Sequence, residues 1–146
     1  MNKGEFEEFL YQQIPITKEM GFNILEFTQS KVRISARLEP NINHKSTAFG
    51  GSINSLMTVC GWALVFKNIK EIDPYAHIVI QKSNINYVQP IREDFVAECS
   101  LTDEESKRKF LNMYERHKKS RININVYCYK QETLLAEYEG QYVVFR

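Results

Sequence analysis

The spacing of hydrophobic residues changes along the chain, and each change predicts an element. Phe6, Phe9 and Leu10 recur at helical spacing, so a short amphipathic helix is expected over residues 3–13, with Pro15 ending it. Further along, apolar and polar residues alternate with period two at 31–39 and 120–130, which predicts strands there. Four more strands are expected at residues 22–28, 77–89, 94–102 and 133–145.

A long apolar stretch in the first half of the chain has a different period. From Gly51 or Ser52 to about Lys70 the apolar residues follow a period of 3.6 and cover most of the circumference of a helix. A helix that is apolar on most sides is buried on several sides, so we expect it at the centre of the protein. For the charged stretch at residues 103–120 two interpretations remain, a helix or a long loop with a little helix in it.

The order of these elements predicts an α+β fold. Long antiparallel strands need a cover on one face, and the central helix is the only candidate with enough length and apolarity. We therefore expect a hotdog fold, an antiparallel sheet of about five to six strands wrapped round one long central helix. The 146 residues contain no internal repeat or linker, so a single domain over residues 1–146 is expected.

Composition and charge narrow the functional classes. The formal net charge is +1, so no global field favours nucleic acid or an anionic membrane. No run of about 18 apolar residues could span a membrane, and the N-terminus lacks the apolar stretch of a signal peptide. We therefore expect a cytoplasmic protein with neither nucleic acid nor a membrane as partner. Cys60, Cys99 and Cys128 lack C-x-x-C spacing and are expected to be structural thiols in a reducing compartment.

No cofactor and no metal are expected from the motifs. The chain has no ATP-binding loop, dinucleotide fingerprint or zinc-ligand spacing, and its three histidines are scattered.

The segment from Asn43 to Ser52, NHKSTAFGGS, carries the candidate chemistry. Gly50 and Gly51 open the central helix, where a group can approach the backbone closely and free N–H groups favour a carbonyl oxygen or an anion. We expect the N–H of Gly51 to polarise a carbonyl and hold the developing oxyanion, a donor worth roughly 3 kcal/mol of barrier. The alternative is a turn glycine that only admits the helix to the sheet.

Two residues of the preceding loop are further catalytic candidates. His44 could act as a general base on water or position a substrate, because its unperturbed pKa suits neutral pH, or it could be solvated. Asn43 could bind the carbonyl or orient water, or it could form an Asx turn. Ser46 and Thr47 could touch substrate, but capping of the central helix is the favoured interpretation.

Polar residues on the helix itself complete the candidate site. Asn54, Ser55 and Thr58 lie on one side of it, because positions four apart share a face, and they could line the acyl or water site. Equally, Ser and Thr could bond back to the carbonyl four residues earlier. Thr58 is kept as a catalytic candidate. The candidate substrate-binding residues are Thr47, Phe49, Gly50, Ser52, Asn54 and Ser55.

A cluster of basic residues in the second half of the chain could attract phosphate groups. Acidic residues between them soften the cluster, which could equally be a solvated face. The phosphates of an acyl-coenzyme A or of a phosphopantetheine on an acidic acyl-carrier protein would suit it. The cluster consists of Lys107, Arg108, Lys109, Arg116, Lys118, Lys119 and Arg121.

Three segments resemble a known family over nearly the whole chain. The string PNINHKSTAFGGSINSLMTVCGW, which ends at Trp62, resembles the pattern PN.NH.GTAFGGS…GW of the thioesterase domain at the C-terminus of YiiD-type bacterial acetyltransferase fusions. IPITKEMGF at 14–22 and EYEGQYVVF at 137–145 fit the same family. No acetyltransferase domain is present, so the stand-alone form is expected. The resemblance implies a hotdog fold, a dimer or a dimer of dimers with the site at the interface, and hydrolysis of an acyl thioester carried by coenzyme A or acyl-carrier protein.

One departure from the wider superfamily affects the mechanism. Many hotdog thioesterases, which this chain resembles, carry a His-Gly-Gly motif where this chain has Phe49-Gly50-Gly51. They also carry an Asp or Glu nine residues after that His, where this chain has Thr58. Thr cannot serve as a carboxylate base. Two alternatives therefore stay open: a non-hydrolytic protein that binds acyl-coenzyme A or acyl-carrier protein, and a dehydratase or isomerase of the same fold, for which His44 is the only obvious site histidine.

Overall fold

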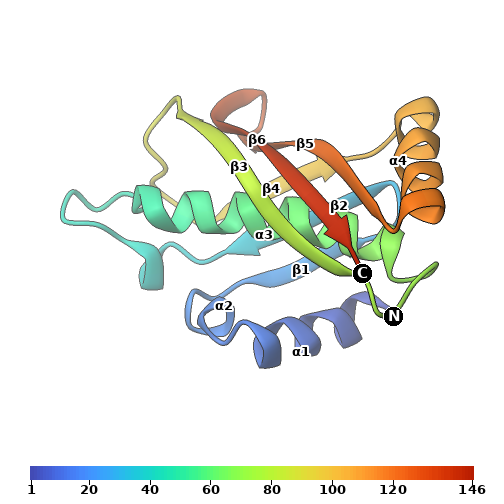
Figure 1. Cartoon of the computed structure of the whole chain (residues 1–146). Helices are drawn as coiled ribbons and strands as arrows, with labels where there is room; N and C mark the ends of the chain where they lie inside the picture. The colour runs from blue at the N-terminus through green and yellow to red at the C-terminus, as the bar shows by residue number, and fades with distance from the viewer.

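The computed structural model of the chain describes residues 1–146 and contains one antiparallel sheet and one long central helix (Figure 1). The helices are α1 (Lys3–Gln13), α2 (Ile16–Glu19), α3 (Gly50–Ile69) and α4 (Glu104–His117), with a 3-10 turn at Glu39–Asn41. The strands are β1 (Asn23–Phe27), β2 (Lys31–Ala36), β3 (His77–Tyr87), β4 (Phe95–Ser100), β5 (Lys119–Lys130) and β6 (Thr133–Phe145).

The six strands form a single sheet in the order β1-β2-β4-β5-β6-β3, and every pairing is antiparallel. The helix α3 contacts all six strands, so the sheet wraps round it. This confirms the predicted hotdog fold and the α+β class. The two edges of the sheet are β1 and β3, and β3 is the strand that directly follows the central helix.

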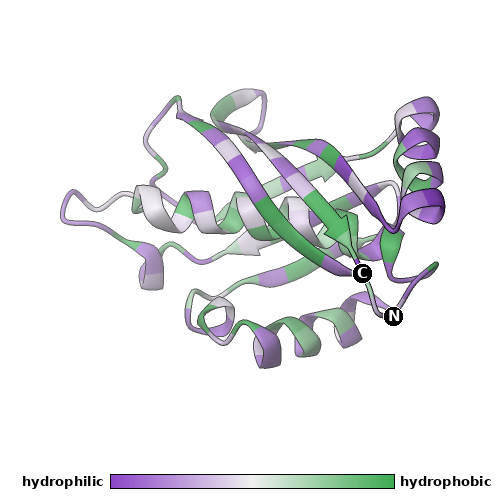
Figure 2. Cartoon of the chain, viewed as in Figure 1, coloured by the Kyte–Doolittle hydropathy of each residue, from purple (hydrophilic) through white to green (hydrophobic).

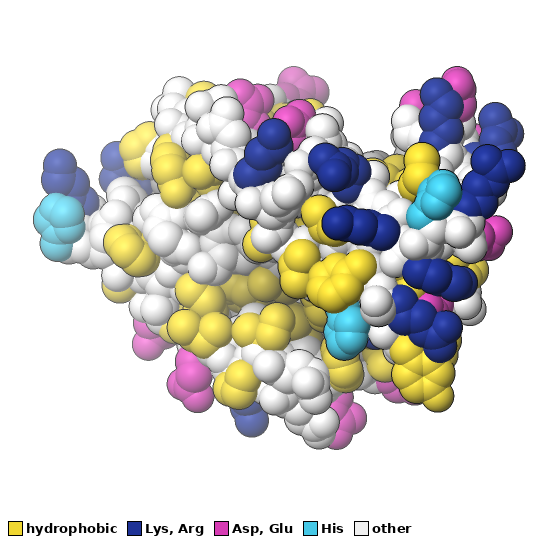
Figure 3. Space-filling model, viewed as in Figure 1, with side chains coloured by type: hydrophobic (Ala, Val, Ile, Leu, Met, Phe, Trp, Pro, Cys, Tyr) yellow, Lys and Arg dark blue, Asp and Glu magenta, His cyan; other side chains and the backbone are white.

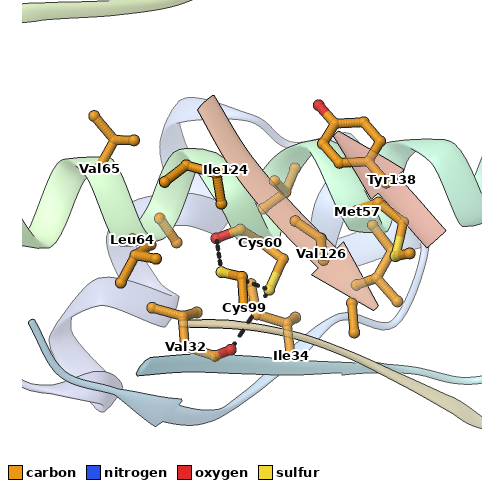
Figure 4. Close-up of a cluster of buried hydrophobic side chains, with 14 of the residues drawn as sticks. Val32, Ile34, Met57, Cys60, Leu64, Val65, Cys99, Ile124, Val126 and Tyr138 are labelled. Carbon is orange, nitrogen blue, oxygen red and sulfur yellow. Dashed lines mark hydrogen bonds between the residues drawn. The ribbon is translucent and has the colours of Figure 1, made fainter. Parts of the chain in front are cut away.

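The central helix is the middle of the hydrophobic core, as its apolar circumference predicts. Cys60, on the buried side of α3, packs against Val32 of β2 and Cys99 of β4, with the two sulfur atoms 3.6 Å apart (Figure 4). On the side facing β6, Gly61 leaves room for the hydroxyl of Tyr142, which a Cβ at this position would meet at 2.4 Å. The helix therefore lies close to the sheet on both sides.

The N-terminal helix covers the β1 edge. A reciprocal capping box between Asn2 and Glu5 begins α1, and its buried face carries Phe6 and Leu10. The ring of Phe6 stacks on Phe27 of β1 at 4.2 Å between centroids and also approaches Phe66 of α3. One edge of the sheet is thus shielded by an aromatic cluster.

The charged stretch at residues 103–120, left open by the sequence, contains a true helix. Asp103 caps α4 by accepting hydrogen bonds from the N–H groups of Glu105 and Ser106, and Lys118 ends it in the left-handed conformation. The buried face is narrow, because only Phe110 and Tyr114 are fully covered where α4 packs on β5. Tyr114 donates a hydrogen bond to Asp73 over 2.5 Å and so fixes α4 to the turn after α3.

The opposite edge of the sheet, formed by β3, is open. Nearly all residues of this strand are exposed, including two of the apolar run Ile78–Ile80 near its start, whereas residues 81–84 are polar (Figure 2). Val79, Ile80 and Tyr87 are large apolar or aromatic residues with substantial exposure. Long unprotected edges of this kind are templates for pairing with another chain.

The boundaries differ from the prediction at a few places. The central helix begins at Gly50, just before the predicted start, and the second strand ends at Ala36 because Leu38 already leads into the 3-10 turn. The short helix α2 was not predicted, and Pro15 starts it rather than only ending α1. No helix is long and apolar enough to cross a membrane.

Candidate active site at the start of the central helix

The loop that leads into α3 is built around the side chain of Asn43. Its Oδ1 accepts hydrogen bonds from the N–H groups of Lys45 (2.9 Å) and Thr47 (3.1 Å), which is an Asx turn. Its Nδ2 donates to Thr47 Oγ1 (2.9 Å) and to the carbonyl of Ala48 (3.4 Å). All polar atoms of this side chain are therefore engaged within the loop, and Asn43 shapes the site from outside.

The expected capping of α3 by Ser46 or Thr47 is wrong. The N-cap is Phe49, which makes no side-chain hydrogen bond to the helix. Thr47 turns its hydroxyl to Asn43 instead, and Ser46 adopts the left-handed region with φ of 62° in the turn. The start of α3 is consequently left without a side-chain acceptor.

Two backbone N–H groups at this helix start have no partner in the protein. The N–H groups of Ser52 and Ile53 both donate to the carbonyl of Phe49, whereas those of Gly50 and Gly51 donate to no acceptor. Gly51 is exposed to solvent. Unpaired donors at the positive end of a 20-residue helix are available to an oxygen acceptor.

The ring of Phe49 lies against Gly51. A Cβ on Gly51 would lie 2.6 Å from Phe49 Cε2, so the absence of a side chain lets the ring rest there. Phe49 is 57% exposed. Phe49 therefore forms an apolar wall beside the free N–H group of Gly51.

Tyr87, at the end of β3, is the residue of this site that sequence reasoning missed. Its hydroxyl donates to the carbonyl oxygen of Gly50 over 3.0 Å, and its ring lies 3.4 Å from where a Cβ of Gly50 would be. Tyr87 is 53% exposed, so it borders both the helix start and the open sheet edge. No local pattern points to it, because only the fold brings residue 87 next to residue 50.

One side of α3 continues the site into the protein. Gly50, Asn54 and Thr58 are spaced by four residues, and because Gly50 faces Tyr87, this side is directed towards β3. The Oδ1 atom of Asn54 is buried and has no hydrogen-bond partner. A buried carbonyl without a donor is costly, so this atom is a natural acceptor for a water molecule or a substrate group.

The hydroxyl groups on the helix are occupied by backbone contacts. Thr58 Oγ1 donates to the carbonyl of Asn54, and Ser55 Oγ donates to that of Gly51, each over 2.8 Å. The carbonyl of Thr58 accepts a hydrogen bond from Tyr142 over 2.7 Å, and burial raises the pKa of Tyr142, so that it stays protonated as the donor. The second interpretation of Ser55 and Thr58, back-bonding, therefore describes their positions here.

His44 lies apart from this group. It is exposed in the loop and forms no hydrogen bond, so no protein group orients its imidazole ring. The loop projects past the start of α3 at the left of Figure 1.

The structure thus brings together Phe49, Gly50, Gly51, Tyr87 and Asn54, with Thr58 one turn further along. Ser52 is buried beside them, and no group of three or more His, Cys, Asp or Glu could hold a metal ion.

The fold and these unpaired donors define a hotdog-fold protein with a candidate site at the N-terminus of its central helix. The family model described as "Putative thioesterase (yiiD_Cterm)" matches residues 3–146. The chain therefore belongs to this family.

Solved structures share the whole architecture. A Chlorobaculum tepidum protein of unknown function is 29% identical, with a TM-score of 0.91 and coverage of 99% of this chain and 94% of that chain. A Shewanella oneidensis protein named a "putative thioesterase" is 26% identical, with a TM-score of 0.87 and coverage of 99% and 97%. A Haemophilus influenzae thioesterase, 11% identical, matches with a TM-score of 0.75 over 100% of this chain and 92% of its own, and shows the fold alone.

Proposed function

We propose that the protein hydrolyses an acyl thioester whose carbonyl oxygen binds at the start of α3. The observation that carries the proposal is the pair of unpartnered N–H groups on Gly50 and Gly51 at the positive end of the helix. Such donors stabilise the negative charge that develops on the carbonyl oxygen during attack by water. In this proposal Gly51 is the principal donor, and Phe49 is the apolar wall for the acyl group.

The attacking water is proposed to bind next to Asn54. The buried Oδ1 of Asn54 lacks a donor, and a water molecule there would lie on the side of α3 that continues from Gly50. Thr58 borders the same space one turn further along the helix. His44, the histidine of the loop preceding the helix, is the proposed general base, although within one chain it lies apart from this water.

A second copy of the chain is proposed to complete the site. The β3 edge is eleven residues long, exposed, partly apolar and unpaired on one side, and Tyr87 joins it to the start of α3. Antiparallel pairing of two copies through this edge would make one continuous sheet and cover the exposed apolar residues. The thioester site would then lie at the interface of a homodimer.

Thiol release from a panel of acyl-coenzyme A and acyl-carrier-protein substrates tests the proposal. The panel runs from short to long chains and includes aryl groups, because the size of the acyl site determines which acyl groups it accepts. We expect turnover by the wild type, a large loss in His44→Ala and a smaller loss in Thr58→Ala, since the Thr58 hydroxyl is already bonded to Asn54. Absence of thiol release for every substrate would contradict hydrolysis.

A non-hydrolytic binding protein is the second candidate. Many hotdog thioesterases carry a carboxylate at the position of Thr58. In this chain the Thr58 hydroxyl is bonded back to the carbonyl of Asn54, which favours the binding function. Tight calorimetric binding of an acyl-coenzyme A without turnover would identify this function. A dehydratase of the same fold is the weakest alternative, because it needs a His with a carboxylate, and water addition to an enoyl thioester would reveal it.

A further inference from the structure

We propose that the groove between α4 and the outer face of β5 and β6 binds the nucleotide phosphates of coenzyme A, and that it serves the thioester site of the partner subunit. The inference rests on the proposed function, because it names the carrier of the acyl group. It also assigns a role to Lys109, Lys119 and Arg121, the residues of the basic cluster that line this groove.

The groove has the size and lining of a small-molecule site. Its volume is about 860 Å³, within the range usual for ligand pockets. The apolar residues that line it are Phe110, Met113, Ile122 and Val143, of which Met113 is the exposed one. A second hollow of about 740 Å³ shares His117, Lys119 and Val143 with it and extends it to the end of the sheet at Phe145 and Arg146.

The charge of the groove is basic and uncompensated. Lys109, His117, Lys119 and Arg121 line it, and no Asp or Glu does. Lys109 pairs with Glu105, whereas none of the other three takes part in an ion pair within the protein. In Figure 3 the basic side chains gather over α4 and the neighbouring part of the sheet, around a hydrophobic centre. Arg and Lys side chains in this state are ready donors to phosphate oxygens.

Within one chain the groove lies far from the thioester site. The helix α3 has 20 residues and is roughly 30 Å long at the usual rise, and α4 lies at the end opposite to its start (Figure 1). The site and the groove of the same subunit are therefore not joined by a short path.

Pairing through β3 brings the two together across the interface. When two copies of β3 run antiparallel about a twofold axis, the Tyr87 end of one lies beside the His77 end of the other. His77 pairs with Phe145, which pairs with Lys119, so three neighbouring strands place these residues in one row. At the usual strand spacing, the strand of Lys119 of the partner subunit is about 14 Å from Tyr87. An extended pantetheine arm spans such a distance round the end of the sheet.

The dimensions favour a nucleotide over an acidic protein. A protein partner needs about 800 Å² of surface on each side, whereas this hollow is bounded by α4 on one side and the sheet on the other. We therefore assign the groove to the phosphate-bearing end of coenzyme A.

The first experiment compares two thioesters that differ in the nucleotide, because S-acyl-pantetheine lacks both the adenosine and all the phosphates of acyl-coenzyme A. Kinetics are measured for an acyl-coenzyme A and for the matching S-acyl-pantetheine, using wild type and the double variant Lys119→Gln/Arg121→Gln. The control Arg108→Gln/Arg116→Gln removes the same charge from exposed positions of α4 outside the groove. We expect the KM for acyl-coenzyme A to rise about tenfold or more in the groove variant only, with the KM for acyl-pantetheine unchanged. Equal KM values in groove variant and control would overturn the proposal.

A carrier-protein arm separates the two sources of a phosphopantetheine. If the groove variant impairs turnover of an acyl-carrier protein but not of acyl-coenzyme A, the nucleotide assignment is wrong. If neither thioester is hydrolysed by the wild type, calorimetric titration with coenzyme A and with adenosine 3′,5′-bisphosphate decides. If the groove variant binds these nucleotides about tenfold more weakly than the wild type, the groove is supported as a nucleotide site even though the proposed hydrolysis is wrong. Unchanged or absent binding overturns it.

Mixed dimers test whether the groove acts across the interface. A Gly51→Pro subunit is co-expressed with a Lys119→Gln/Arg121→Gln subunit, and the mixed dimer is isolated with two different tags. If the groove serves the partner, one of the two sites is intact, and the mixed dimer shows the wild-type KM with about half the wild-type kcat. A raised KM, as in the groove variant alone, would contradict action across the interface.

Discussion

The hydroxyl of Tyr87 donates a hydrogen bond to the carbonyl oxygen of Gly50, which ties the last residue of β3 to the first residue of α3. The open edge of the sheet and the unpaired donors of the helix start are therefore parts of one structural unit. Any partner that pairs with β3 also comes to lie next to the proposed thioester site.

Removal of this hydroxyl should affect turnover more than folding. In Tyr87→Phe the ring stays beside Gly50 but no longer holds its carbonyl, so kcat/KM is expected to fall about three- to tenfold, and unfolding free energy by less than about 1.5 kcal/mol. Thiol-release kinetics and urea unfolding measure the two effects. Tyr75→Phe is the matched control, because Tyr75 is exposed and its hydroxyl forms no hydrogen bond. Equal kinetics for Tyr87→Phe and wild type would contradict the role of this contact.

A charge on the β3 edge should dissociate the proposed dimer. Ile80 is 39% exposed on this edge, and Ile80→Lys would place two ammonium groups in the pairing interface. We expect a dimer for wild type and a monomer for the variant in light scattering after gel filtration. Leu25→Lys makes the same change at a residue 38% exposed on the opposite edge strand and should remain dimeric. A monomeric wild type, or a dimeric Ile80→Lys, would argue against pairing through β3.

The Tyr114–Asp73 pair should make part of the stability depend on alkaline pH. Burial, together with the hydrogen bond to Asp73, raises the pKa of Tyr114 to about 12 from its ordinary value of 10.0. Because the folded pKa is the higher one, the stabilisation is fully present below pH 10 and is lost as pH rises towards about 12. Urea midpoints of wild type and Tyr114→Phe should therefore converge between these values. A constant difference across this range would show that the hydroxyl does not titrate with the fold.

The same pair should act with the opposite sign in acid. The hydrogen bond from Tyr114 is the main cause that lowers the pKa of Asp73 below its ordinary value of 3.8. Stability from this carboxylate is present above pH 3.8 and is lost as pH falls through the lower folded pKa. Acid titrations of the two proteins provide the internal check on the alkaline result.

The three cysteines should be unreactive in the native protein. All are buried, and burial raises the pKa of Cys128 to about 11 and that of Cys60 well above its ordinary value, so thiolate is scarce. A chromogenic disulfide reagent at pH 8 is expected to label no thiol in the folded state and all three in denaturant. Rapid native labelling of any cysteine would contradict the described packing.

The elements that could be predicted from sequence are those whose pattern reflects burial on one side. The helix at 3–13 and the strand at 133–145 are predicted with the observed boundaries, because helical spacing defines the first and the turn at Gln131 and Glu132 precedes the second. The helix at 104–117 was ambiguous, since only Phe110 and Tyr114 among its 14 residues are buried. The four-residue helix at 16–19 is too short to show any period.

The candidate site was predictable only where it is local. The two glycines at 50 and 51 predict the open start of the helix, and their unpaired N–H groups lie there in the structure. Tyr87 could not be found, because the fold alone brings it to Gly50 across 37 residues of sequence. The cap was predicted at the wrong residues, since Ser46 and Thr47 fit the composition of a helix cap while Asn43 draws them into the loop.

The central claim is tested most directly by thiol release from an acyl-coenzyme A by Gly51→Pro beside Gly51→Ala. Proline is tolerated in the first turn of a helix and removes only an N–H that has no acceptor in α3, so the fold should persist by circular dichroism. Alanine adds the same Cβ against Phe49 but keeps the N–H, and so controls for crowding.

For hydrolysis at the start of α3, Gly51→Pro should lose about 10²- to 10³-fold in kcat while Gly51→Ala keeps most of its activity. A folded Gly51→Pro that turns over its thioester as fast as Gly51→Ala would contradict the account, because the carbonyl oxygen would then be held elsewhere.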